Sequence, residues 1–321
     1  MTDLLAPPAG RYESSCIVDN LVVQQRAAVA ELVESGVIPH LGIILPAYQD
    51  GSVHGPSQKY VGRKRAHGEA IGAKSTVVTV GRYAVSTGIE EFNDDSAVHG
   101  LIVQLPLPSY PNELPELLAQ RTQSRLKLID PAKDVDALRP RDPNTPFDEK
   151  AEYAAATPAA VMRMLDEQQT VPLEPGSRVL VNGAAGFLVG RHMAPLLRAR
   201  GITPLTHDKS HYSYDVSQAE LAADLRDKIT EADIVVSCVG QPGMITPAML
   251  PKKRPMVIID AGLKSVKGQL RGDLDPAVET ARPDILYTPP INGVGPLTVT
   301  ELWQNLIRAA RRANGAYNLA A

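Results

Sequence analysis

The sequence predicts an α/β protein of two domains, the second built on a Rossmann-like parallel sheet. Its 321 residues exceed the roughly 100–200 that one domain usually holds. Short apolar strands alternate with helical segments along most of the chain, which is typical of α/β folds. Residues 179–190 predict a strand, a glycine-punctuated turn and a helix. We therefore expect domains at 1–150 and 151–297, followed by a C-terminal helix over 298–321.

The first half of the chain predicts alternating helices and strands. Apolar residues recur at helical spacing over 16–35, and Gly36 stands where a helix C-cap would be. Pro56 or Ser57 can open a second helix that Gly72 ends. The predicted elements are a helix at 16–35, a strand at 40–45, a helix at 57–71, a strand at 74–80, a weaker helix at 88–94 and a strand at 99–105.

The second half predicts a succession of buried strands after a crossover. Residues 139–152 are rich in proline and charge, and we take them as the connection between the domains. Residues 209–225 show no clear period and predict a surface excursion. Thr298-Val-Thr-Glu301 is a capping box and predicts the start of the last helix. The other predicted elements are a helix at 157–168, a strand at 178–182, a helix at 190–200, a strand at 202–207 that contains Pro204, and strands at 234–238 and 256–261.

Composition excludes several classes of protein. Hydrophobic residues make up 44% and charged residues 21%, which is typical of a globular protein. The net charge is -3 without a Lys/Arg block, so we expect no nucleic-acid partner. No apolar run approaches the roughly 20 residues of a membrane helix, and the N-terminus has no leader pattern. Cys16 and Cys238 are far apart, which favours a reducing cytoplasm, and no residue spacing predicts a metal site.

The turn at 183–190 predicts a nucleotide site. Glycines at 183, 186 and 190 would let the backbone approach a phosphate at a helix N-terminus. The spacing is not Gly-x-Gly-x-x-Gly, so a tight turn without a ligand is the alternative. Asp208 ends the next predicted strand, where a carboxylate accepts hydrogen bonds from the ribose of NAD and repels the 2′-phosphate of NADP. An ordinary loop aspartate is the alternative there.

The first half carries candidate acid/base groups. Tyr60 and Lys64 are four residues apart on a predicted helix and share a face, as solvated pairs also do. A lysine in a partly dry cleft has a lowered pKa and can handle protons. Gln104 ends a buried strand, where its amide could hold that lysine. Asp136 follows Asp134 on a loop; it is either solvated or the clamp of a flat, amino-substituted ring.

The glycine/proline turn before the last helix leaves two interpretations open. The rigid turn from Gly293 to Pro296 suits close backbone approach to a ligand, or a structural loop. Cys238 lies in an apolar strand, so we expect an unreactive thiol in the core. Trp303 lies at helical spacing, so we expect its side chain to pack in the core.

Several motifs together resemble the bifunctional methylenetetrahydrofolate dehydrogenase/methenyltetrahydrofolate cyclohydrolase family. The resemblance covers roughly residues 40–310. It rests on the order and spacing of Tyr60-x-x-x-Lys64, Val103-Gln-Leu-Pro-Leu-Pro108, Pro131-Ala-Lys-Asp-Val-Asp136, Thr157-Pro158, Val189-Gly190, Gly272-Asp-Leu-Asp275 and Gly293-Val-Gly-Pro296.

The resemblance implies oxidation of 5,10-methylenetetrahydrofolate by a nicotinamide cofactor, then hydrolysis to 10-formyltetrahydrofolate. It implies a folate-binding N-terminal domain, rejoined by the final helix, a dinucleotide-binding domain and a homodimer. By this likeness Lys64 is the acid/base group, Gln104 orients it, Tyr60 stacks on the folate and Asp136 holds the pterin. Gly293 and Pro296 are expected to touch the substrate. The expected cofactor-binding residues are Gly183, Ala185, Gly186, Gly190, Asp208, Gly240 and Leu263.

Departures from the family pattern change the expected cofactor. The family turn usually reads Gly-Arg-Ser-x-x-Val-Gly, and Ala185 and Gly186 occupy its Arg and Ser positions. Asp208 replaces a common Ser or Arg. These changes remove groups that favour a 2′-phosphate, so we expect NAD over NADP. Two alternatives stay open: an NAD-dependent dehydrogenase of another small or pterin-type substrate, and a non-catalytic folate- or nucleotide-binding relic.

Overall fold

The chain forms two compact units, each with its own parallel sheet. The computed structural model describes residues 10–142, 145, 147–213, 215–252 and 254–315. Of these, 18–142, 151–156 and 299–315 belong to what we call the three-stranded unit. Residues 10–17, 145, 147–150 and 157–298 belong to the six-stranded unit, except for those that are not described. The α/β class with parallel sheets is confirmed. Residues 10–17 lie in the second unit, although the predicted boundary places them in the first.

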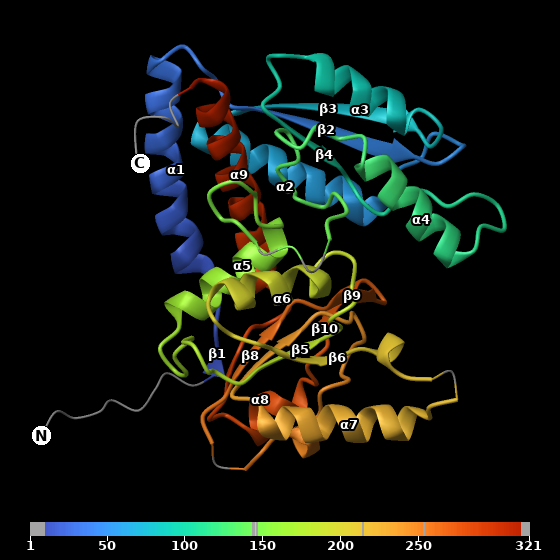
Figure 1. The fold of residues 1–321 in the computed structure, drawn as a ribbon, viewed down its shortest axis with the longest axis vertical. Coiled ribbons are helices and arrows are strands. Elements are labelled where there is room, and N and C mark those ends of the chain that lie inside the picture. Colours follow the sequence, from blue (N-terminus) through green and yellow to red (C-terminus); the bar gives the residue numbers. More distant parts are fainter. Residues whose placement is uncertain (1–9, 143–144, 146, 214, 253, 316–321) are drawn as a thin grey trace, which may run out of the picture. The chain divides into compact units, whose positions relative to one another are not determined.

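The three-stranded unit is a parallel sheet with a central strand buried along its whole length. Strand β2 (His40–Ala47) pairs with β3 (Lys74–Gly81) on one side and β4 (Gly100–Val103) on the other. Figure 1 shows α3 on one face of this sheet and α2 and α9 on the other. The helices of the unit are α1 (Ser15–Glu34), α2 (Gly55–Ile71), α3 (Val85–Asp94), α4 (Pro115–Leu126) and most of α9 (Val294–Ala313). Helix α4 is not predicted by the sequence pattern.

Helix α9 packs into the core between α1 and α2 (Figure 1). Trp303 of α9 is fully buried, and its indole Nε1–H donates to the Lys64 carbonyl of α2 at 3.0 Å. Gly68 lies one turn further along α2, where a Cβ would stand 2.4 Å from the Trp303 ring. The indole therefore packs against α2 where Gly68 leaves space for it. On the α1 side, Gln25 donates to the Thr300 carbonyl at 2.8 Å.

The six-stranded unit is a parallel sheet in the order β1-β11-β8-β7-β5-β6. Helices α5 and α6 lie on one face, and α7 and α8 lie on the other (Figure 1). A separate antiparallel hairpin joins β9 to β10. The bounds are β1 (Gly10–Arg11), α5 (Ala156–Glu167), β5 (Val179–Asn182), α6 (Gly190–Ala199), β6 (Leu205–His207), α7 (Gln218–Glu231), β7 (Ile234–Ser237), β8 (Val257–Asp260), β9 (Leu263–Val266), β10 (Gln269–Gly272), α8 (Ala277–Ala281) and β11 (Leu286–Tyr287).

Three local predictions are wrong. The surface excursion at 209–225 contains a short 3-10 turn (Lys209–His211) and the start of α7, which Ser217 and Glu220 cap reciprocally. Helix α9 begins at Val294, so Thr298 lies inside it and donates to the Val294 carbonyl at 3.1 Å. Strand β6 begins after Pro204, which has no N–H to donate to the sheet. Residues 316–321 of the predicted last helix lie outside the described residues.

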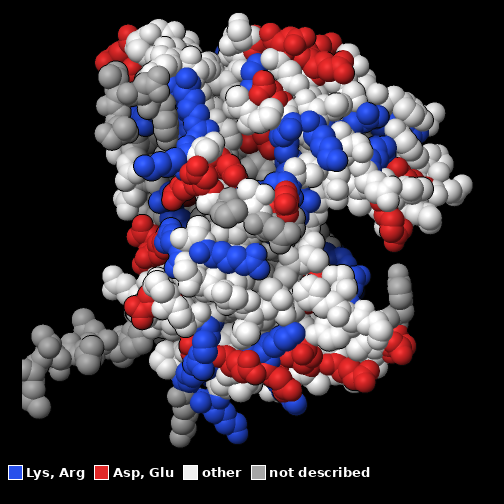
Figure 2. All heavy atoms as spheres, viewed as in Figure 1, with Lys and Arg blue, Asp and Glu red and all other residues white. Residues whose placement is uncertain are grey.

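Two surface findings bear on possible partners. Among the helices of the described residues, none is long and apolar enough to cross a membrane. On the face shown in Figure 2, lysines and arginines are interspersed with aspartates and glutamates.

The contact between Gly68 and Trp303 predicts that adding one methyl group at residue 68 strongly lowers stability. Gly68→Ala should lower the free energy of unfolding by about 1–3 kcal/mol, since the indole must shift. The matched control is Gly62→Ala on the same helix, where a Cβ meets open space. That variant should gain about 0.5–1 kcal/mol because alanine restricts the unfolded chain. Urea unfolding measures both, and equal stabilities would contradict the packing argument.

Candidate functional site

Lys64 is the most unusual side chain of the three-stranded unit, because only 5% of it is exposed. Its Nζ donates to Oε1 of Gln104 at 3.0 Å and lies 5.5 Å from the centre of the Tyr60 ring. The Gln104 amide is itself held, since its Nε2 donates to the Leu105 carbonyl at 2.9 Å. The structure thus brings together Tyr60, Lys64 and Gln104 as the sequence predicts.

The charge of Asp136 acts on Lys64. Burial lowers the pKa of Lys64, and Asp136 partly opposes that shift. Burial raises the pKa of Asp136, and Lys64 partly opposes that shift. The two groups are therefore coupled: each keeps the other closer to its charged form inside a weakly solvated site.

The loop that carries Asp136 is fixed from two directions. The Lys133 carbonyl accepts from Leu101 of β4 at 2.7 Å, and the Val135 carbonyl accepts from Nδ2 of Asn305 at 2.9 Å. Asp134 is 6% exposed and accepts from the Arg139 backbone N–H at 3.0 Å. Burial raises the pKa of Asp134 to about 6. Asp134 is thus a buried residue that holds the loop through its hydrogen bonds to the backbone. Asp136 is the acid of the pair whose charge acts on Lys64.

In the six-stranded unit, the glycine turn connects β5 to α6 as predicted. Gly183 has φ of +86°, and a Cβ at Gly190 would stand 1.9 Å from the Gly183 carbonyl oxygen. Gly186 donates to that same oxygen at 2.9 Å. Side chains at 183 and 190 are excluded by backbone conformation and by space, so the start of α6 lies directly against the turn.

A cavity of about 1010 Å³ opens beside this turn. Its lining includes five of the predicted cofactor residues: Gly183, Ala185, Gly186, Asp208 and Gly240. The Asp208 carboxylate is braced against the turn, because its Oδ2 accepts from the Ala185 N–H at 3.0 Å and its Oδ1 from the Ser210 N–H at 2.9 Å. Burial opposes ionisation of Asp208, but these hydrogen bonds outweigh it and lower its pKa. The acid is a fixed anion on the cavity wall.

Four other predicted residues are placed differently. Gly190 is not among the lining residues and instead packs against Gly183. Leu263 is on β9 with 40% of its surface exposed, and its neighbour Lys264 lines the cavity. Gly293 is buried, with its carbonyl accepting from Oγ of Ser14 at 2.7 Å. Pro296 lies in the first turn of α9.

Sequence reasoning missed a polar chain beneath the cavity. Asn182 donates through Nδ2 to Oγ of Ser237 at 2.9 Å, and Ser237 donates to Oδ2 of Asp273 at 2.7 Å. The Asn182 Oδ1 therefore faces His207, whose Nδ1 lies 2.8 Å away and donates to it. Burial lowers the pKa of His207. A signal existed: Asn182, Ser237 and His207 are the polar last residues of apolar strands.

Cys238 is not the core residue that the sequence predicts. It follows β7, is partly exposed and lines the cavity. Its Sγ donates to the Asn182 carbonyl at 3.1 Å, and burial raises the pKa of the thiol to about 12. The predicted absence of reactivity follows from that pKa and not from a core position. Among the described residues no group of His, Cys, Asp or Glu could hold a metal ion.

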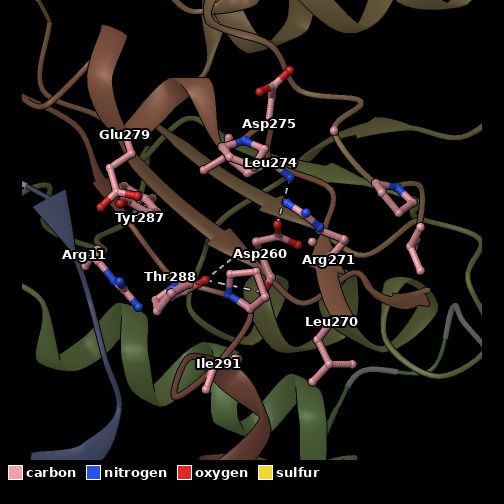
Figure 3. A pocket seen from close by; sticks show the side chains of 17 residues that line it. Arg11, Asp260, Leu270, Arg271, Leu274, Asp275, Glu279, Tyr287, Thr288 and Ile291 are labelled. Carbon is pink, nitrogen blue, oxygen red and sulfur yellow. Dashed lines mark hydrogen bonds between the residues drawn. The ribbon is translucent and has the colours of Figure 1, made fainter. Parts of the chain in front are cut away.

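Two buried carboxylates brace the loops at the other side of the same sheet edge. Asp260 forms part of a second cavity of about 500 Å³, in which Arg11, Tyr287 and Thr288 also appear (Figure 3). Its Oδ2 accepts from the Leu274 N–H at 2.8 Å and its Oδ1 from the Gly262 N–H at 3.0 Å.

Asp273 is the second of these buried carboxylates. It accepts hydrogen bonds from the backbone N–H groups of Val239 and Gln241 at 2.9 and 2.7 Å. A Cβ at Gly262 or Gly272 would stand 2.1 or 2.2 Å from the Asp273 or Asp260 carboxylate. The glycines thus allow the acids to reach the backbone of the loops that line both cavities.

Comparisons with known proteins agree over most of the chain. Residues 15–136 match the catalytic-domain model of tetrahydrofolate dehydrogenase/cyclohydrolase, and residues 155–314 match its NAD(P)-binding-domain model. The bifunctional protein FolD of Macrococcus caseolyticus is 33% identical over 304 residues, which span 91% of this chain and 96% of the relative. That of Francisella philomiragia is 32% identical over 287 residues, spanning 88% and 90%.

Solved structures show the same likeness. The bifunctional FolD methylenetetrahydrofolate dehydrogenase/cyclohydrolase of Campylobacter jejuni has a TM-score of 0.76 and 25% identity, covering 94% of this chain and 98% of its own. The Trypanosoma brucei FolD, complexed with NADP and an inhibitor, has a TM-score of 0.77 and 26% identity, covering 96% and 99%.

The buried Asp260 predicts a defined pH dependence of stability. Burial, reinforced by Asp273, raises its pKa from 3.8 to about 7 in the folded state. Between these two values the unfolded carboxyl ionises first, so rising pH favours unfolding. The unfolding free energy of the native protein should fall relative to that of Asp260→Asn across this range, as denaturant titrations at successive pH values would measure. Asp275→Asn, at the same cavity, should keep the native slope; a native slope in Asp260→Asn would contradict the assignment.

Proposed function

The chain belongs to the tetrahydrofolate dehydrogenase/cyclohydrolase family, and on that premise we propose its reaction and the residues that perform it. It oxidises 5,10-methylenetetrahydrofolate to the methenyl compound with a nicotinamide dinucleotide and hydrolyses that product to 10-formyltetrahydrofolate, in one-carbon metabolism. The family that the sequence motifs predict is confirmed. The observation that carries the residue assignment is the buried ammonium of Lys64, held by Gln104 beside Asp136.

Lys64 is the acid/base group of the hydrolytic step. A water oxygen bonds to the methenyl carbon, and the bond from that carbon to N5 breaks. Two protons leave the water; one ends on N5 and the other in solvent, so a group that accepts and returns protons accelerates the step. Burial lowers the pKa of Lys64, which makes its neutral amine easier to form than that of an exposed lysine. Gln104 fixes the direction of Nζ by accepting one of its hydrogens.

Tyr60 and Asp136 bind the substrate. The Tyr60 ring lies one helical turn before Lys64 and offers a flat, half-buried surface for stacking. The carboxylate of Asp136 accepts hydrogen bonds from adjacent N–H donors of the pterin edge, and Lys64 favours its ionised form against the burial that raises its pKa. Substrate contacts by Gly293 and Pro296 stay predictions.

The glycine turn fits a dinucleotide. Because Gly183 and Gly190 lack side chains, the start of α6 lies directly against the turn that lines the cavity, and the dipole of that helix favours an anion such as a pyrophosphate there. Lys209 and Lys264 line the same cavity and offset the charge of the pyrophosphate. When bound, the nicotinamide accepts a hydride from the substrate.

The cofactor is NAD rather than NADP. The ionised, braced carboxylate of Asp208 supplies acceptors for ribose hydroxyls and repels a phosphate at the same position. Ala185 and Gly186 contribute no cation or hydroxyl beside it. The preference therefore depends mainly on the negative charge at residue 208.

The protein works as a cytoplasmic homodimer. The hairpin β9–β10 exposes Leu263, Val266 and Leu270, each at about 40% of its surface, and an apolar patch of this kind is typical of a protein interface. Cys16 and Cys238 are free, which suits a reducing compartment.

Replacing the acid/base group should separate the two reactions. Lys64→Met should lower the rate of methenyltetrahydrofolate hydrolysis by at least about 100-fold, because a positioned acid/base group contributes 10²–10⁴-fold. Some oxidation of methylenetetrahydrofolate should remain. Loss of methenyl absorbance and formation of the reduced nicotinamide measure the two steps.

The control is Lys59→Met, an exposed lysine on the same helix α2. It should retain hydrolysis at the native rate. Hydrolysis by Lys64→Met within twofold of the native protein would remove Lys64 from the chemistry. Absence of both reactions in the native protein would defeat the proposed function as a whole.

The charge of Asp208 predicts the cofactor preference. Asp208→Asn removes the anion with little change in shape, so the ratio of kcat/KM for NAD to that for NADP should fall at least about tenfold, equivalent to roughly 1.4 kcal/mol. Asp215→Asn, in the same segment but outside the cavity lining, should leave the ratio unchanged. An unchanged ratio in both variants would show that Asp208 does not select the cofactor.

A further inference from the structure

The segment that begins at Asp208 forms one wall of the nucleotide cavity, and helix α7 forms another. We call residues 208–213 the Asp208 segment; it contains the 3-10 turn Lys209–His211. The lining residues are Asp208, Lys209 and Ser210 from this segment, and Gln218, Leu221, Ala222 and Leu225 from α7. The shape of the cavity therefore depends on how the Asp208 segment is held against α7.

Tyr212 connects these two walls. Its hydroxyl donates to Oδ2 of Asp224 on α7. The Nζ of Lys228, one helical turn further along α7, lies 2.8 Å from the same carboxylate oxygen and donates to the Tyr212 hydroxyl oxygen at 3.4 Å. We call these three residues the Tyr212 cluster. Their hydrogen bonds form a closed ring that joins the Asp208 segment to the helix.

The Tyr212 cluster has a fixed arrangement of donors and acceptors. Burial opposes ionisation of Asp224, but the hydrogen bonds from Lys228 and Tyr212 outweigh it and lower the pKa of Asp224. Burial and the bond to Asp224 raise the pKa of Tyr212. Asp224 is therefore an anion that accepts, and Tyr212 is a neutral phenol that donates. Hydrogen bonds to an ionised acceptor are stronger than those between neutral groups, so this contact can hold the segment in place.

The other end of the Asp208 segment is held by the glycine turn. The carbonyl of His207, directly before Asp208, accepts from the Gly183 N–H at 2.8 Å. The His207 ring is buried between the two anchors: its centre lies 5.9 Å from that of Tyr212, and its Nε2 lies 3.8 Å from Oδ2 of Asp224. The position of the Asp208 carboxylate thus depends on the turn at one end and on Tyr212 at the other.

We propose that Tyr212 is a positioning residue for the cofactor: through Asp224 it holds Asp208 where the carboxylate receives the ribose hydroxyls of NAD and repels the 2′-phosphate of NADP. This inference rests on the proposed function, which places the ribose of NAD at Asp208. Tyr212 is not among the residues that line the cavity, so its effect reaches the cofactor through the Asp208 segment.

The test measures dinucleotide binding by calorimetry, without folate and without turnover. Tyr212→Phe removes only the hydroxyl. It should raise the Kd for NAD at least about fivefold, because a hydrogen bond to an ionised acceptor is lost. The Kd for NADP should change little, so the preference for NAD falls. In the unliganded variant, the Ser210 backbone N–H, which donates to Asp208, should exchange with deuterium faster than in the native protein.

Tyr12→Phe is the matched control. The Tyr12 hydroxyl donates to the Met164 carbonyl at 3.0 Å in the same unit, and Tyr12 does not line the cavity. This variant should bind NAD like the native protein. Asp224→Ala should reproduce the effect of Tyr212→Phe. Because Tyr212 acts through Asp224, the double variant should bind NAD no more weakly than Asp224→Ala alone.

Native affinity for NAD or native exchange at Ser210 in Tyr212→Phe would overturn the proposal. Equal losses for NAD and NADP would also overturn it, since a merely structural role affects both dinucleotides alike. The same holds for an equal loss in Tyr12→Phe, or for additive losses in the double variant. Binding of neither dinucleotide by the native protein would instead refute the proposed function, and this inference with it.

Discussion

Removal of an ammonium group from water is the constraint on which the three-stranded unit depends. An isolated buried charge costs several kcal/mol, so Lys64 is stable in place only because an amide accepts from it, a ring lies beside it and a carboxylate acts on it. Each of these groups comes from a different segment: α2, the end of β4 and the loop before residue 137. Helix α9 holds the arrangement from below, since Trp303 binds the Lys64 carbonyl and Asn305 the Val135 carbonyl.

The six-stranded unit buries acidic side chains where the three-stranded unit buries a basic one. Asp260 and Asp273 are almost fully buried and receive backbone N–H groups from the loops around both cavities. Gly262 and Gly272 make this possible by leaving space for the carboxylates. Both units thus use buried ionisable side chains to fix loops at the carboxyl ends of parallel strands, where α/β proteins place ligands.

Much of this could be predicted, because local signals were strong. Gly72 ends α2 as its position indicates, and the four-residue spacing of Tyr60 and Lys64 places the ring beside the ammonium that Gln104 binds. Strands that depend on long-range pairing are harder to predict from the sequence. Strand β1 has only two residues, and it is a strand because it pairs with β11, far away along the chain. The capping box at Thr298 misled because the helix begins one turn earlier, at Val294. The network from Asp273 to His207 joins four separate segments, so no single sequence window contains it.

The contrast between the two cysteines has a practical consequence. The thiolate is the form that attacks alkylating reagents, and the Cys238 thiol, with its pKa near 12, stays protonated at neutral pH. Cys16 is exposed in the first turn of α1 and is not among the residues that line the nucleotide cavity. A maleimide dye would therefore attach at one position of the unmodified polypeptide, which makes fluorescence reporters accessible without cysteine engineering.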